Sequence, residues 1–431
     1  MLSSLRHRNF RLFFFGQGVS LVGTWMQSTA MPWLVYQMTG SVLWLGVVGF
    51  TGQILTFVMA PLAGVLADRW NRRRLVLAAQ TLAMLQALAL AALTLTGRVE
   101  VWHIVALSVL TGFIRGFEVP TRQSFVIEMV GSRADLPNAI ALNSFLVNGA
   151  RMVGPPLAGG ILALIAAGEP GPRDTLAAGA VFLINSLTYL PVIGAFLAMR
   201  VAPRRLQPPT TDVLGGLVEG FRYAAGHAPI RSILLLVSAV SLVGVPYTTL
   251  MPVFAKDVLG GGPETYGYLM GATGVGALVG AIYLASRKRA AGLGRAILGA
   301  AVLFGAGLVA FGLSRSLWLS LPLLAAAGAG MMMQMAGSNT LLQTLTDEDK
   351  RGRVMSFYTM AFMGMVPFGA LLAGWLAHAF GPSATVILGG VVCVAGALVF
   401  GRRLPGLADA APAQVVAVAA EASVPPTAEN P

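Results

Sequence analysis

A few ionisable residues lie inside the long apolar runs of this sequence, and these residues could do chemistry there. Arg115 and Glu118 are three positions apart, so they share one face of a helix. Burial in hydrocarbon favours the neutral form of a carboxyl group, whereas a neighbouring arginine favours the charged form. Breaking the pair could therefore make Glu118 take up a proton. The same spacing equally fits a permanent ion pair that holds neighbouring helices together.

Arg151 lies near the middle of another apolar run. If Glu118 pairs with Arg115, Arg151 has no acidic partner. It then either binds an anionic substrate or donates to helix carbonyl groups and water. We favour the second role, because an arginine can satisfy its five N–H donors in many ways.

The composition places these residues in a membrane. The chain has 56% hydrophobic and 11% charged residues and a mean hydropathy of +0.75, whereas soluble domains carry roughly 25% charged residues. The net charge of +12 comes from short basic clusters between apolar runs. Such clusters fit an anionic membrane surface and exclude an extended nucleic-acid-binding face.

Twelve apolar runs are long enough to cross a bilayer as helices. They lie near residues 10–37, 43–67, 74–97, 101–126, 138–166, 175–199, 229–256, 265–286, 294–313, 317–344, 353–379 and 383–402. We predict an all-α integral membrane protein with twelve transmembrane helices in two pseudo-symmetric six-helix bundles.

The predicted domains follow from these runs. The N-terminal bundle spans residues 1–200 and the C-terminal bundle residues 229–403. A polar, proline-rich cytoplasmic linker, residues 201–228, separates them and contains a short helix around Val213 to Tyr223. Residues 404–431 are expected to form a disordered tail.

The basic residues predict the orientation. If the N-terminus and the connections from even to odd runs lie on one side of the membrane, 23 of the 29 Lys and Arg residues lie on that side. Four lie on the other side, namely Arg98, Arg173, Lys256 and Arg315, and Arg115 and Arg151 lie inside runs. The positive-inside rule then puts both termini in the cytoplasm.

The two halves also repeat. Gly149, Gly154 and Gly159 recur 215 positions later, at Gly364, Gly369 and Gly374. Such parallel repeats occur in transporters whose substrate site lies between two halves.

The segment Gly64 to Arg74 places an acid and a basic cluster between two apolar runs. Its pattern Gly-x-x-x-Asp-Arg-x-x-Arg-Arg resembles the signature of the loop between helices two and three in the major facilitator superfamily, with Asn71 where that family usually has glycine. The resemblance implies that this loop contacts the cytoplasmic end of helix eleven and holds one access state closed. The predicted latch comprises Gly64, Asp68, Arg69, Arg72, Arg73 and Arg353.

The fifth run contains small residues and a Pro155-Pro156 pair. Small residues allow helices to approach closely, and the prolines remove backbone hydrogen bonds, which predicts a kink. The run resembles the Gly-Pro signature of exporters in the same superfamily. The predicted hinge comprises Gly149, Gly154, Pro155 and Gly159.

Further segments are similar to the drug and siderophore exporter branch, which includes enterobactin exporters and macrolide efflux proteins. They are residues 23–27, 32–36, 67–69, 120–123, 138–144 and 351–356, and the similarity runs from Arg8 to Arg402. It implies a proton-coupled antiporter that exports a small organic molecule across the bacterial inner membrane. Because lysophospholipid transporters of similar architecture work inward, one alternative is a lysophospholipid or metabolite transporter that runs inward. The alternative of another class is a non-transporting membrane sensor or assembly protein.

Polar and aromatic residues that could line a central cavity are Trp25, Gln27, Asn143, Asn148, Arg151, Asn185, Tyr247, Gln334 and Asn339. The four histidines have no metal-ligand spacing, and the sequence has neither a nucleophile–base pair nor a phosphate-binding loop. We therefore predict no enzyme activity, metal or cofactor. The expected partners of this monomer are a small-molecule substrate, protons and membrane lipids.

Overall fold

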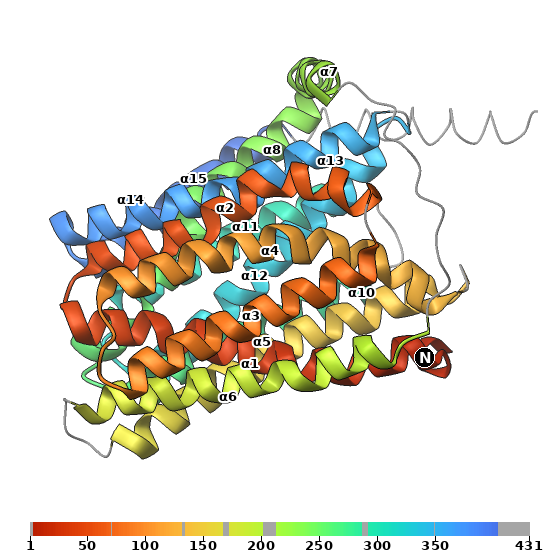
Figure 1. Ribbon diagram of the computed structural model, residues 1–431. Coiled ribbons are helices and arrows are strands. Elements are labelled where there is room, and N and C mark those ends of the chain that lie inside the picture. The colour runs from red at the N-terminus through yellow and green to blue at the C-terminus, as the bar shows by residue number, and fades with distance from the viewer. Residues whose placement is uncertain are drawn as a thin grey trace, which may run out of the picture.

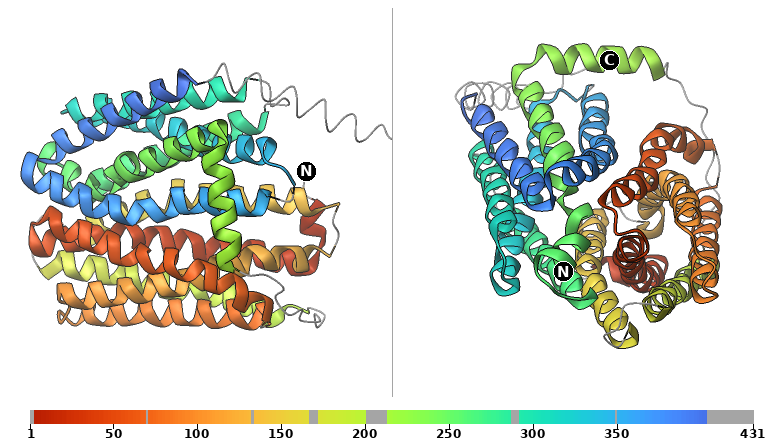
Figure 2. Two further views of the ribbon diagram at one scale, coloured as in Figure 1. Left: turned by 90° about the horizontal axis from the view of Figure 1, so that it is seen from above. Right: turned by 90° about the vertical axis from the view of Figure 1, so that its left-hand side faces the viewer.

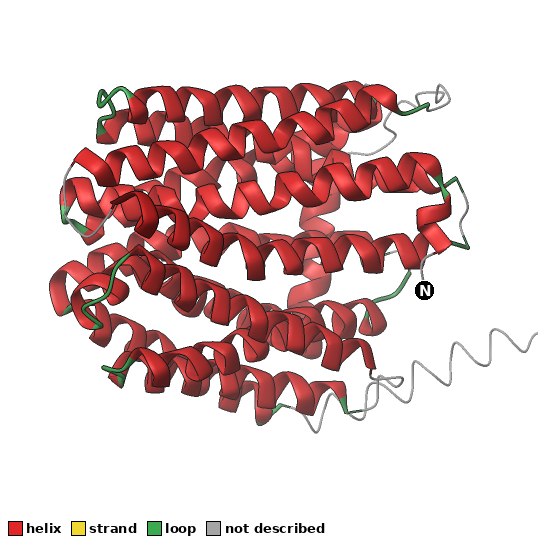
Figure 3. Ribbon diagram, turned by 90° about the horizontal axis from the view of Figure 1, so that it is seen from below, coloured by secondary structure: helices red, strands yellow, loops and turns green. Residues whose placement is uncertain are grey.

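The computed structural model is helical throughout the part of the chain that it describes (Figures 1 and 3). The described residues are 3–69, 71–131, 134–166, 172–200, 213–286, 292–348 and 350–403, without the side chains of 60–69, 172–173 and 213–218. No strand occurs in these residues. The predicted tail, 404–431, and the start of the predicted linker, 201–212, lie outside them.

Six long helices follow the short helix η1 (Ser3–Arg6). They are α1 (Arg8–Thr39), α2 (Val42–Arg69), α3 (Arg72–Leu95), α4 (Val101–Val130), α5 (Leu136–Ala166) and α6 (Pro172–Ala198). A further helix, α7 (Val213–Gly226), forms where the sequence predicts a short linker helix.

The C-terminal helices contain two interrupted segments. The first comprises α8 (Ala228–Ala239), the π-helix η2 (Val240–Gly244), the 3-10 helix η3 (Val245–Leu250), α9 (Met251–Val253) and the π-helix η4 (Phe254–Val258). The next three helices are α10 (Pro263–Ser286), α11 (Leu293–Leu313) and α12 (Leu317–Leu345). The second interrupted segment comprises α13 (Arg351–Thr359), the π-helix η5 (Met360–Gly364) and α14 (Met365–Phe380). The last helix is α15 (Pro382–Gly401).

Eleven helical segments of the described chain are long and apolar enough to cross a membrane. The 32-residue helix α1 is not among them. It carries polar residues, including Gln17, Ser20 and Gln27, along its length, and these lower its hydropathy. The twelve-helix count and the two-bundle arrangement therefore stay predictions.

The starts of α1 and α3 meet the end of α6 at one end of the molecule. Arg8 Nη1 donates to the Ala198 carbonyl at 3.0 Å, and Arg73 Nε donates to the Phe196 carbonyl at 2.7 Å. We call this the basic end. The opposite end contains the end of α1 at Thr39 and the start of α10 at Pro263. Helix α7 runs across the other helices near the basic end (Figure 2).

The N-terminal helices α1–α6 contact the C-terminal helices α8–α15 through α5 against α10 and α2 against α14. These contacts need glycine. A Cβ atom added to Gly267 of α10 would lie 3.1 Å from Gly159 Cα, and one added to Gly374 of α14 would lie 3.1 Å from Gly46 Cα. The glycines therefore bring the helix backbones together on the side of the opposite end.

Candidate functional site

The interior of α4 contains a polar cluster. Glu118 Oε1 accepts a hydrogen bond from Arg122 Nε at 2.6 Å and another from Gln80 Nε2 of α3 at 3.3 Å. Arg122 Nη1 reaches Asn143 Oδ1 of α5 at 3.4 Å. The Glu118 and Arg122 side chains are only 13% and 8% exposed. Three helices therefore surround one largely buried ion pair.

The partner of Glu118 differs from the one predicted. Sequence analysis pairs Glu118 with Arg115, but the described structure gives Arg115 no ion pair and pairs Glu118 with Arg122. Helical side chains point toward the helix N-terminus, so an arginine four residues after a glutamate leans back toward it. Arg115 precedes Glu118 and leans away. The spacing of four residues could have identified Arg122 in advance.

Arg151 of α5 lies beside Trp25 of α1, with its guanidinium carbon 5.6 Å from the centre of the ring. Its Nε atom is buried and has no hydrogen-bond partner. Among the described residues, neither a carbonyl group nor an acid accepts a hydrogen bond from this arginine. The structure thus does not supply the carbonyl contacts that we favoured for Arg151 from the sequence.

Tyr247 of η3 belongs to the same neighbourhood. Arg151 and Tyr247 interact electrostatically, and the Tyr247 hydroxyl donates to Thr273 Oγ1 of α10 at 3.4 Å. Helix α10 also touches the backbone of α5, because a Cβ added to Gly274 would lie 2.9 Å from the Arg151 carbonyl oxygen. The cluster of Trp25, Arg151, Tyr247 and Thr273, which we call the arginine site, therefore joins N-terminal and C-terminal helices.

Several other predicted cavity residues bond within the helix groups. Gln27 of α1 donates to Gln86 Oε1 of α3 at 3.2 Å and accepts from Asn185 Nδ2 of α6 at 2.7 Å. Gln27 and Asn185 are buried. Asn148 donates to the Ser144 carbonyl one turn earlier on α5. The amides of Gln27, Gln86 and Asn185 thus connect α1, α3 and α6, whereas Asn148 bonds within α5.

The two predicted residues of α12 have separate environments. Gln334 is fully buried and donates to Ser338 Oγ at 3.3 Å, while its Oε1 atom has no partner. Asn339 accepts from Gln343 at 2.6 Å in an exposed position. Of these two residues, Asn339 is the one that is open to solvent or ligand.

The predicted hinge lies in a continuous helix, because α5 runs through Pro155 and Pro156 without interruption. Gly154 packs against Trp25, and Gly159 against Pro263 and Gly267, whereas a Cβ added to Gly149 would meet nothing within 4 Å. These glycines allow close packing. The interruptions that the structure contains lie in Val240–Val258 and Met360–Gly364 instead.

The side chains of the latch residues Gly64, Asp68 and Arg69 lie outside the described residues. Arg72 Nη1 lies 3.0 Å from Glu128 Oε1 of α4, and Arg73 donates to carbonyl groups at the end of α6. These two contacts hold α3 to its own helix group.

Arg353 of the predicted latch forms an ion pair with Glu219 of α7 at 2.6 Å. Glu219 also accepts a hydrogen bond from Lys350. The sequence prediction missed Glu219.

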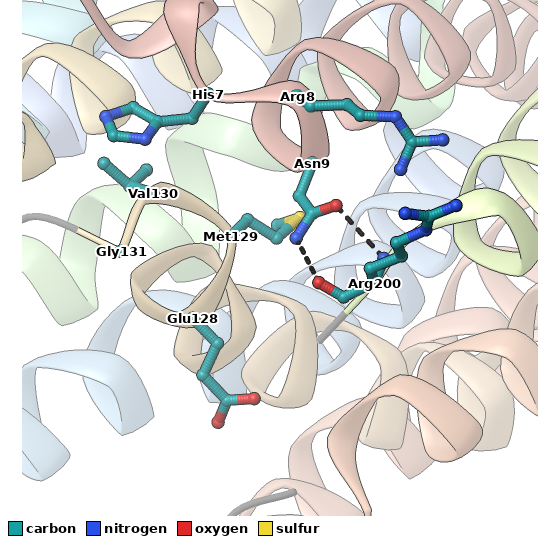
Figure 4. Close-up of a pocket in the computed structure, with 8 residues that line it drawn as sticks. All are labelled: His7, Arg8, Asn9, Glu128, Met129, Val130, Gly131 and Arg200. Carbon is teal, nitrogen blue, oxygen red and sulfur yellow. Dashed lines mark hydrogen bonds between the residues drawn. The ribbon is translucent and has the colours of Figure 1, made fainter. Parts of the chain in front are cut away.

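A surface pocket of about 350 Å³ lies at the basic end (Figure 4). Asn9 and the backbone of Arg200 exchange hydrogen bonds of 2.8 and 3.2 Å there. They fasten the start of α1 to the chain after α6. The pocket is lined by His7, Arg8, Asn9, Glu128, Met129, Val130, Gly131 and Arg200, and so includes neither the Glu118 pair nor the arginine site.

In the described part of the chain, no three His, Cys, Asp or Glu side chains come close enough together to hold a metal ion.

Comparison with known proteins identifies relatives over nearly the full length. A family model described as transmembrane secretion effector matches residues 1–421. The staphyloferrin A transporter of Staphylococcus aureus is 25% identical over 90% of this chain and 95% of its own length. The multidrug efflux pump Tap of Mycolicibacterium fortuitum is 28% identical over 86% of this chain and 88% of its own length.

A solved structure has the same fold. A bacterial homologue of the human lysosomal transporter Spinster, in an inward-facing conformation, superposes with a TM-score of 0.68. The match covers 95% of this chain and 97% of the other, at 15% sequence identity.

Proposed function

This chain belongs to the transmembrane secretion effector family of the major facilitator superfamily, and on that premise we propose that it exports a small organic molecule by proton-coupled antiport. Membership confirms the superfamily predicted from the sequence. It also makes the chain a multi-pass membrane transporter and not an enzyme. Antiport, proton coupling and export are the finer parts of the proposal.

We further propose the bacterial inner membrane as the location, with the basic end and both termini in the cytoplasm. In this arrangement α1 also crosses the membrane and brings the number of spans to twelve, and a six-helix bundle lies on each side of the linker. The protein would act as a monomer surrounded by lipids.

The ion pair of Glu118 and Arg122 is the observation that carries proton coupling. It joins a carboxylate to a guanidinium inside a span, where an ionisable group is a functional candidate. Gln80 and Asn143 offer each partner a second polar contact on a neighbouring helix. Protonation of Glu118 would release Arg122 toward Asn143, so a proton could change the contacts between α3, α4 and α5.

Contacts at the opposite end support alternating access. Trp33 of α1 stacks on Tyr266 of α10 with ring centres 6.1 Å apart, and Lys256 donates to Gln37 at 2.6 Å. Together with the glycine contacts of α5 and α10, they close this end. We propose that these contacts break in the other access state, and that the latch of Gly64, Asp68 and Arg69 then engages the region of Arg353.

Proton flux in proteoliposomes tests the function. The vesicles contain a pH dye and native protein, Glu118→Gln or the matched control Glu100→Gln, which changes an exposed acid at the start of the same helix. Siderophores, macrolides, lysophospholipids and cationic drugs are added in turn.

We expect one class to trigger proton movement in the native protein and the control but not in Glu118→Gln. Triggered flux that survives Glu118→Gln would remove the carrier role. No flux with any compound would contradict antiport.

A further inference from the structure

The middle of the helices has more positive than negative charge. Away from the helix ends, α1–α6 and α8–α15 contain four Asp, Glu, Lys or Arg residues, namely Arg115, Glu118, Arg122 and Arg151. Glu118 is bonded to Arg122. Arg115 and Arg151 therefore remain without an acid among the described residues.

Of these two arginines, Arg151 has a buried N–H group that lacks a hydrogen-bond acceptor. Its Nε atom is buried without an acceptor, and its interaction with Trp25 uses the flat face of the guanidinium and not its N–H groups. An unpaired charge inside a membrane protein is unfavourable unless another group compensates it. The residue as a whole is partly buried, and its Nε atom is enclosed.

The groups around Arg151 suit a particular kind of ligand. Trp25 contributes a flat aromatic surface, and Tyr247 and Thr273 contribute two hydroxyl groups. A guanidinium presents paired donors that match the two oxygens of a carboxylate. Two uncompensated arginines also repel a cation.

We propose that the arginine site binds the carboxylate of an organic anion, whose flat apolar body packs against Trp25. This inference depends on the transport function proposed above and specifies the class of its substrate. Trp25 and Arg151 come from N-terminal helices, whereas Tyr247 and Thr273 come from C-terminal helices. A bound carboxylate therefore contacts the two helix groups that move against each other during transport.

The test compares two probes with the same ring system and nearly the same shape, 2-naphthoate and its neutral amide, 2-naphthamide, in which an NH2 group replaces one carboxylate oxygen. Binding to the purified full chain in detergent is measured by equilibrium dialysis. We expect the native protein to bind the acid about tenfold more tightly than the amide, which corresponds to one charge-assisted contact. Arg151→Gln should abolish this preference, and Arg151→Lys should retain part of it.

The control is Arg98→Gln, which makes the same change of net charge at an exposed position. It should keep the native preference. Thermal unfolding of each variant verifies that it is folded, and the Arg151→Lys variant provides a second measurement if Arg151→Gln is unstable.

Equal affinities for acid and amide in the native protein, no binding of 2-naphthoate, or an unchanged preference in folded Arg151→Gln would each overturn the site. The outcome is independent of the proteoliposome experiment. Failure of proton flux would overturn antiport and leave an observed carboxylate preference intact.

Discussion

The hydroxyl group of Tyr36 donates a hydrogen bond to the carboxylate of Asp257 and so joins α1 to η4. Lys256 lies 5.8 Å from the centre of the Tyr36 ring and also bonds Gln37. Lys256 and Asp257 of η4 thus contact Tyr36 and Gln37 near the end of α1. Because these elements belong to different helix groups, this contact closes the opposite end of the molecule.

Tyr36→Phe should weaken this closure while keeping the ring that faces Lys256. A hydrogen bond to a charged group contributes about 1.5–3 kcal/mol, so its loss should shift the equilibrium between access states about tenfold or more toward opening. Nitroxide labels at Ser41 and Leu259 report the separation, in a background where Cys393, the only cysteine, is replaced by alanine.

Tyr283→Phe is the matched control, because Tyr283 is an exposed tyrosine of α10. It should leave the distances unchanged. Identical distance distributions in native protein and Tyr36→Phe would show that the bond does not hold this end closed.

The crossing of α5 and α10 gives a second prediction. Gly267→Ala places a Cβ atom 2.8 Å from the Pro155 carbonyl oxygen, and backbone on both sides limits relaxation. We expect a loss of about 1–3 kcal/mol of stability, as for other overpacked sites. Gly160→Ala is the control on α5, where an added Cβ meets nothing within 4 Å. Thermal melts should show a lower Tm for Gly267→Ala alone, and equal values would contradict the tight crossing.

Helix positions were predictable from the sequence because bilayer thickness and charged ends limit where an apolar run can stop. Predicted and observed ends differ by at most four residues, the largest difference being at the end of α4. The interruptions in Val240–Val258 were not predicted, although Pro246 and Pro252 mark that segment. Pro155 and Pro156 lie inside a helix that is assigned without interruption, and the kink predicted there stays a prediction.

The candidate site was predicted in part. Glu118 and Arg151 stood out because charges are rare inside apolar runs. The partner Arg122 was missed, although its spacing of four residues from Glu118 could have identified it. The pairing of Glu219 with Lys350, 131 positions away, was not predictable, because it depends on how α7 lies across the other helices.

Asn71 illustrates a local signal and gives the third prediction. It begins α3, and its side chain accepts a hydrogen bond from the backbone N–H of Arg74 at 3.1 Å. Asn71→Ala should therefore destabilise the protein by about 1 kcal/mol, whereas Asn71→Asp should be neutral and Asn71→Gly should cost only a few tenths. Thermal melts of the three variants measure this order. Equal stability of Asn71→Ala and Asn71→Asp would exclude a capping role.

The docking of α7 should depend on pH through Glu219. Its contacts with Lys350 and Arg353 lower the pKa of the Glu219 carboxyl below its ordinary value. A carboxylate with a lowered pKa stabilises the docked state at pH values above its ordinary pKa of about 4.3, and this contribution disappears as the pH falls through the lower, docked value. Docking should thus be tight at pH 7 and weaken only in strong acid.

Nitroxide labels at Arg222 of α7 and Thr340 of α12, in the same cysteine-free background, measure this dependence. The native distance distribution should broaden as the pH falls below about 4, whereas Glu219→Gln should be broad already at pH 7, because its neutral amide lacks the charge that holds Lys350 and Arg353. Asp347 accepts a hydrogen bond from Tyr223 at 2.9 Å and so makes a second polar contact with α7, and Tyr223→Phe separates this contact from that of Glu219. A narrow distribution in Glu219→Gln at pH 7 would mean that packing of Phe221 against Phe357, whose ring centres lie 6.2 Å apart, holds α7 without the ion pairs.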